Sequence, residues 1–161
     1  MKFDNDIVVL YGPTWDQPAK LSKHHFARLW SKDRKVLYIE SPPNIFSYFT
    51  RKDEFLRLAL RAKNGPRKLL KNLWVTTFIN FFPIRGSKYL FGSELVNKIN
   101  QFFILDRLKK YIHDLNLINP ILFISTAYAE PLLKYFPDSL KIYHCSDDYT
   151  VISNFPQSFI E

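Results

Sequence analysis

The residues best suited to chemistry are histidines and acids at the ends of apolar runs. His24 and His25 are adjacent, so on a helix they point to different sides and cannot bind one metal ion as an i, i+4 pair does. His144, Asp147 and Asp148 follow an apolar run and include the oxygen ligands that divalent cations prefer. A turn capped by acids explains the same three residues without a metal. We therefore predict no metal site, and a metal-dependent enzyme that uses Asp147 and Asp148 stays as an alternative.

The segment after the first apolar run lacks the motifs of common nucleotide-binding sites. Residues 12–16 (GPTWD) contain one glycine, whereas a dinucleotide-binding fingerprint needs three. The segment also has no Walker lysine at the required spacing. These two differences argue against a dinucleotide dehydrogenase and against a P-loop nucleotide hydrolase.

Composition and charge narrow the class of protein further. The 161 residues, 47% of them hydrophobic, fit one ordered domain, and the single cysteine excludes a disulfide scaffold. Two acids among the first six residues argue against a secretory signal, and the longest apolar-leaning run, 73–84, is shorter than the roughly 20 residues that a membrane-spanning helix needs. The sequence thus predicts a soluble domain on the reducing, cytoplasmic side. Its net charge of +8 favours an anionic partner.

Most of the excess positive charge lies in residues 51–71, which contain eight bases and two acids. Phe55, Leu58 and Ala62 are spaced for one face of a helix, with basic residues beside them. Such a segment suits an anionic membrane surface, and it equally suits a solvated helix packed on the core. Both interpretations stay open. Under the first, the membrane contacts are Arg57, Arg61, Arg67 and Lys68.

The elements that must position these residues alternate between apolar runs and helix-like stretches. Strands are predicted near residues 6–11, 35–39, 73–78, 120–125 and 140–145. Helices are predicted at 21–32, in the basic segment with a break at 64–66 where no helix would continue, at 91–115 and at 127–135. Continuous apolar strands between helices are typical of a parallel sheet that is covered on both faces. We therefore predict an α/β fold with a Rossmann-like open parallel sheet and helices on both faces.

The predicted sheet directs attention to the loops after its strands. Ligands of open α/β sheets bind outside the carboxyl ends of the strands. The loops in question are residues 12–23, 40–44, 78–86, 125–130 and 146–150.

Six short segments, in order along nearly the whole chain, carry a family resemblance. They are residues 7–15 (IVVLYGPTW), 22–29 (SKHHFARL), 35–43 (KVLYIESPP), 73–75 (LWV), 120–124 (PILFI) and 142–149 (IYHCSDDY). Each segment is weakly specific alone. Together they resemble the N-terminal domain of bacterial GT-B glycosyltransferases of the group 1, family 4-like type, which build envelope and capsular polysaccharides.

The resemblance implies an enzyme of two Rossmann-like domains with the active site between them. The N-terminal domain mostly holds the acceptor, and the C-terminal domain holds the nucleotide-sugar donor. Residues 1–161 are then expected to be the acceptor-side domain, truncated before the donor domain and inactive alone. The full-length protein would transfer a sugar to a polysaccharide or lipid-linked acceptor, at the inner face of the cell membrane and without a cofactor.

The resemblance also implies roles for residues in the loops. The loop 12–23 would face the donor phosphates and the acceptor, where Gly12 permits close backbone approach and Lys23 or His24 meets an anion at a helix start. An inverting transfer needs a general base, for which Asp16, His24 and Asp147 are unranked candidates, and a retaining transfer needs none. The implied substrate-binding residues are Gly12, Trp15, Lys23, His24, Ser125, Thr126 and Asp148.

Two other function classes remain as alternatives. One is the metal-dependent, GT-A-like transferase that uses Asp147 and Asp148. The other is a non-catalytic module that binds a membrane or nucleic acid through the basic segment and its aromatic neighbours. The α/β alternation and the lack of an RNA-binding motif favour the GT-B transferase, so no nucleic-acid partner is expected.

Overall fold

The computed structural model describes residues 5–83 and 94–145, and within them six strands form one sheet with the order β3-β4-β2-β1-β5-β6. The strands are β1 (Ile7–Gly12), β2 (Val36–Glu40), β3 (Arg67–Leu70), β4 (Leu73–Thr76), β5 (Ile121–Ile124) and β6 (Lys141–Tyr143). The helices are α1 (Ser22–Trp30), α2 (Ser47–Thr50), α3 (Lys52–Asn64), α4 (Glu94–Asp114) and α5 (Glu130–Leu133), with a 3-10 turn η1 (Ala127–Ala129) before α5.

The sheet is mostly parallel, which confirms the predicted Rossmann-like α/β fold. Strand β1 lies at its centre and pairs in parallel with β2 and β5, while β4 and β6 extend the parallel pairing on either side. Each of the five predicted strands falls on one of these parallel strands. The antiparallel β3 completes the sheet at the edge next to β4.

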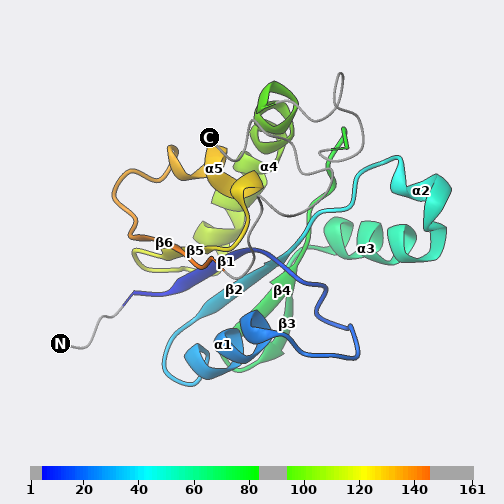
Figure 1. Ribbon diagram of the computed structural model, residues 1–161. Coiled ribbons are helices and arrows are strands. Elements are labelled where there is room, and N and C mark those ends of the chain that lie inside the picture. The colour runs from blue at the N-terminus through cyan, green and yellow to red at the C-terminus, as the bar shows by residue number, and fades with distance from the viewer. Residues whose placement is uncertain (1–4, 84–93, 146–161) are drawn as a thin grey trace.

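Both faces of the sheet are covered, as Figure 1 shows for α1 on one face and α4 on the other. Val9 and Tyr38 belong to the buried cluster that includes Ala27 of α1. Val8 and Leu37, one position earlier on the same strands, belong to the cluster that includes Leu108 of α4. Successive residues of a strand point to opposite faces, so a strand covered on both sides must be apolar throughout. This is why β1, β2 and β5 are nearly continuous apolar runs in the sequence.

The basic segment forms a helix as far as the predicted break at 64–66, and a strand that was not predicted follows the break. Helix α3 ends at Gly65, whose φ of 76° lies in the left-handed region that glycine adopts at low cost. Pro66 cannot continue a helix, and residues 67–70 instead turn back as β3 to pair with β4. The predicted end of the helix at 64–66 is therefore confirmed, whereas β3 is an addition to the five predicted strands.

No helix within residues 5–83 and 94–145 combines the length and the apolar character that crossing a bilayer requires.

Candidate functional site

A pocket of about 270 Å³ lies where β1 and β2 end at the carboxyl edge of the sheet. Pro13 and Thr14 of the loop after β1 form one side, and residues 41–43 of the loop after β2 form another. The remaining lining comes from α2, α3 and the residue between them: Ser47, Arg51, Glu54, Phe55 and Leu58. This is the edge at which ligands bind in open α/β sheets, so the pocket is the best candidate for a binding site.

A larger hollow of about 570 Å³ lies at the opposite end of the molecule. It is formed by the last turn of α4, by residues 116–117 and by Phe136. Residues 116–117 lead into β5, so this hollow belongs to the amino edge of the sheet. Open α/β sheets bind their ligands at the other edge, and the smaller pocket is therefore the stronger candidate.

The loop after β1 is held in place by aromatic packing at its start. An added Cβ at Gly12 would lie 2.2 Å from the hydroxyl oxygen of Tyr38, and that hydroxyl donates a hydrogen bond to the carbonyl of Pro13 at 2.8 Å. Trp15 is buried and meets the Tyr38 ring edge-on at 5.0 Å. The close approach that glycine permits at position 12 is thus an approach to Tyr38, and Trp15 anchors the loop in the core.

His24 is fully buried beneath this loop and hydrogen-bonds the backbone with both ring nitrogens. Its Nδ1 accepts from the N–H of Leu21 at 3.0 Å, and its Nε2 lies 3.3 Å from the carbonyl oxygen of Thr14. Burial lowers the pKa of His24, and a neutral ring with its proton on Nε2 satisfies both contacts. His24 therefore holds the loop in place from the core through contacts with the backbone of Leu21 and Thr14.

A cluster of charged side chains lies beside the pocket, with Glu40 and Arg61 at its buried end. Glu40 is the last residue of β2 and is fully buried. Its Oε1 accepts hydrogen bonds from the N–H of Trp15 at 2.6 Å and from Arg61 of α3. Only 8% of the Arg61 side chain is exposed. This pair joins the end of β2, the first loop and α3.

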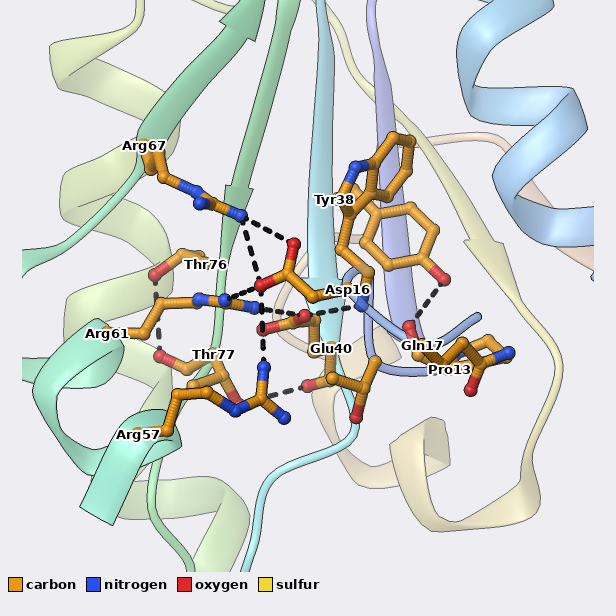
Figure 2. A network of polar contacts seen from close by, with 12 residues as sticks. Pro13, Asp16, Gln17, Tyr38, Glu40, Arg57, Arg61, Arg67, Thr76 and Thr77 are labelled. Atoms are coloured by element: carbon orange, nitrogen blue, oxygen red, sulfur yellow. Dashed lines mark hydrogen bonds and ion pairs between the residues drawn. The ribbon is translucent and has the colours of Figure 1, made fainter. Parts of the chain in front are cut away.

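The outer part of the cluster is Asp16, on which three arginines converge (Figure 2). Arg61 pairs with Asp16 as well as with Glu40. Arg57 of α3 lies 3.4 Å from Asp16 Oδ2, and Arg67 of β3 lies 3.1 Å from Asp16 Oδ1. Burial opposes ionisation of Asp16, but hydrogen bonds from Arg61 and Arg67 outweigh it and hold the pKa of Asp16 below its usual range. Asp16 is consequently ionised and engaged at neutral pH.

The pKa of Asp16 bears on its predicted role as a general base. A general base works best when its pKa lies near the operating pH. The arginines move the pKa of Asp16 in the opposite direction. In this arrangement Asp16 is better suited to hold charge than to accept a proton.

The other predicted site residues are spread over a wider region. Ser125 and Thr126 follow β5, on the side of β1 away from β2, and Lys23 lies in the first turn of α1. The pocket is lined instead by Pro13, Thr14 and the α2–α3 residues. Asp147 and Asp148 lie outside the described residues. Within residues 5–83 and 94–145, no three histidine, cysteine or acidic side chains are grouped to hold a metal ion.

In the charged cluster, Glu40 is the residue that the sequence analysis does not single out. It stood in the sequence as an acid directly after the apolar run 36–39. A charge that ends a fully buried strand must find a partner, and this rule points to Glu40 without naming Arg61 as that partner.

No protein-family model, curated protein or solved structure matches the chain.

Proposed function

We propose that this chain is the acceptor-binding, Rossmann-like domain of a GT-B-type glycosyltransferase. The observation that carries the proposal is the composition of the pocket. Its two loop walls, Pro13–Thr14 and residues 41–43, come from two separate segments that resemble this family, 7–15 and 35–43. The fold brings these segments together at the edge of the sheet that binds ligands.

The chemistry of the lining suits a sugar. Prolines, Phe55 and Leu58 offer apolar surface for the C–H faces of a ring, while Thr14, Ser41 and Ser47 offer hydroxyl groups. Arg51 and Glu54 form an exposed ion pair at 3.3 Å and supply donors and acceptors for sugar hydroxyls. The volume lies just below the roughly 300–1,000 Å³ of pockets for drug-sized ligands, which favours a small ligand such as a sugar unit at the end of an acceptor.

In this proposal the residues of the chain bind and orient the acceptor, and the nucleotide-sugar comes from a second Rossmann-like unit. Positioning of two reactants is itself a large part of catalysis, because it removes the entropic cost of bringing them together. The described residues of the pocket supply that positioning.

Binding measured by NMR on the isotopically labelled chain tests the proposal. We expect methyl glycosides or short glycans to shift the amide signals of Thr14, Ser41 and Ser47. We expect UDP-, GDP- and TDP-sugars to bind weakly or not at all. Ser41→Trp should block the pocket because Ser41 is exposed at its rim, whereas Ser22→Trp, at an exposed serine of α1, should bind like the parent.

Two results would contradict the proposal. Tight nucleotide-sugar binding by this chain would place the donor site here. A complete lack of saturable glycan binding across the panel would remove the acceptor site.

We also propose that the chain docks on an anionic membrane surface, where a lipid-linked acceptor is presented. The supporting observation is an exposed aromatic surface made of Phe46, Phe49, Phe81, Phe102 and Phe103. The N–H of Ile45 bonds the carbonyl of Asn80, and the Phe81 and Phe103 rings lie 4.9 Å apart, so the three segments that carry these residues adjoin. Phe46 directly precedes Ser47 of the pocket lining.

The proposed membrane contact therefore shifts from the basic residues to the aromatic surface. Arg57, Arg61 and Arg67 are directed at Asp16. Lys68 lies over the ring of Trp74, 5.3 Å from its centroid. The positive charge of the molecule then acts as a general attraction to anionic lipids, and the phenylalanines supply the apolar contact.

A further inference from the structure

The charged cluster carries more positive charge than its acids neutralise. Its three guanidinium groups face two carboxylates, Glu40 and Asp16. One positive charge is therefore left over inside the cluster. If the Asp16 carboxylate turned away, two would be left, and a phosphate monoester carries a charge of about −1.5 to −2 at neutral pH.

The contacts of Asp16 with the outer arginines are looser than good contacts of this kind. Arg57 donates at 3.4 Å and Arg67 at 3.1 and 3.4 Å, whereas charge-assisted N–H···O bonds are usually about 2.7–2.9 Å long. Arg57 uses only Nη1 and Arg67 only Nη2 in these contacts. Each guanidinium has five N–H donors, so most donors of both groups are still available to a ligand. The long distances from Asp16 to Arg57 and Arg67, together with the unused donors, fit a ligand that has more acceptor oxygens than a carboxylate.

Asp16 can leave the cluster without disturbing the loop that carries it. Its side chain is 41% exposed, while the preceding Trp15 is buried and its backbone N–H is held by Glu40. Rotation of the Asp16 side chain would free Arg57 and Arg67, which are already partly exposed, and the Arg61 nitrogen that bonds Asp16. Arg61 would stay in place, because its other contact is to the buried Glu40.

We propose that Arg57, Arg61 and Arg67 form a binding site for a phosphate group, which Asp16 occupies in the free protein. The site rests on the charged cluster alone and does not depend on the proposed glycosyltransferase function. Its ligand is a phosphomonoester or a diphosphate, either soluble or on a lipid head group.

A purely structural role for the cluster makes a different prediction. If Asp16 only ties the first loop to α3 and β3, its removal loosens the loop and creates no affinity for anions. If Asp16 is an internal competitor for a ligand site, replacing it with Asn increases the affinity for phosphate, because the competing charge is gone. The direction of this change separates the two roles.

Calorimetry with pyrophosphate as the probe tests the site at low salt. We expect saturable binding by the parent, binding about tenfold tighter in Asp16→Asn, and a loss of about tenfold or more in Arg57→Gln/Arg67→Gln. The matched control is Lys63→Gln/Lys71→Gln, which removes the same charge at two exposed positions of the same segment. Circular dichroism melting of each variant verifies that it is folded.

Three outcomes would overturn the proposal: no saturable binding of pyrophosphate by the parent, equal loss in the lysine control and the arginine variant, or weaker or unchanged binding in Asp16→Asn.

A second experiment identifies the source of the phosphate, using phosphatidylcholine vesicles with and without phosphatidic acid. Vesicle binding that pyrophosphate displaces and that Arg57→Gln/Arg67→Gln loses supports the site with a lipid phosphate as ligand. Pyrophosphate binding without such vesicle binding supports it with a soluble ligand.

Discussion

Glu40 and Asp16 hold the first loop of the chain through different kinds of contact. Glu40 is buried and accepts from the Trp15 backbone and from Arg61, so its partners cannot be exchanged without leaving a buried charge. Asp16 is half-exposed, and two of its three arginine partners, Arg57 and Arg67, also face solvent. At the residue scale, the loop thus has one permanent anchor and one that a ligand can replace.

The lowered pKa of Asp16 makes part of the stability depend on pH. An acid whose pKa is lower in the folded than in the unfolded state stabilises the fold above its unfolded pKa, near 3.9, and loses that contribution as the pH falls through the folded pKa. We expect the parent to be more stable than Asp16→Asn at pH 7 and the difference to shrink below about pH 4. Urea unfolding of both proteins between pH 7 and pH 2.5 measures this. A difference that stays constant over that range would show that the ion pairs of Asp16 contribute nothing.

At the scale of elements, the boundary between α3 and β3 depends on one glycine. Gly65 has φ 76° and ψ −161°, a combination that is strained for residues with a side chain. Gly65→Ala is therefore expected to lower the free energy of unfolding by about 1–3 kcal/mol. Asn64→Ala, at the exposed last residue of α3, should change it by less than about 0.5 kcal/mol. Equal stability of Gly65→Ala and the parent, measured by urea unfolding, would contradict this account.

The elements that the sequence predicted well are those whose structure follows from burial on both faces. Strands β1, β2, β4 and β5 are largely apolar and almost fully buried, which a parallel sheet covered on both faces explains, whereas β6 at the edge is exposed. β3 has no such signal in the sequence, because Arg67 to Leu70 are mostly exposed and form a strand through pairing with β4. The candidate site is likewise only partly predictable from the sequence. Sequence order predicts which loops meet at the carboxyl edge, but the approach of Arg61 to Glu40 depends on how α3 packs.

Helix α4 shows why periodicity alone does not identify a buried face. Its first half buries Asn97, Asn100 and Gln101, which bond the Tyr128 carbonyl, the Phe82 backbone and the Tyr11 hydroxyl respectively. The polar side of this half therefore faces the protein. Apolar residues of the same half are left on the outside, among them Phe102 and Phe103.

Across the whole molecule, the first half of α4 contributes two of the five phenylalanines of the aromatic surface, Phe102 and Phe103. Phe81 and the phenylalanines of the α2 region are also exposed, Phe46 directly precedes Ser47 of the pocket lining, and the net charge of the molecule is +8. Large exposed apolar patches mark contact surfaces. A lipid surface covers such a patch and also meets the positive charge, which is why we favour a membrane as its partner.

Vesicle co-sedimentation of a double variant tests this surface. Phe49 and Phe102 are 80% and 63% exposed, so Phe49→Ser/Phe102→Ser removes apolar contact area without opening the core. Burial of one phenylalanine is worth about 1.5–3 kcal/mol, and we expect the partition onto vesicles of phosphatidylglycerol and phosphatidylcholine to fall by about tenfold or more. Leu29→Ser/Leu140→Ser, at two leucines that are 57% and 56% exposed elsewhere on the surface, should bind like the parent. High salt should weaken vesicle binding by the parent because it screens the charge of the anionic lipids. Equal binding of the parent and the phenylalanine variant would show that the aromatic surface has another partner.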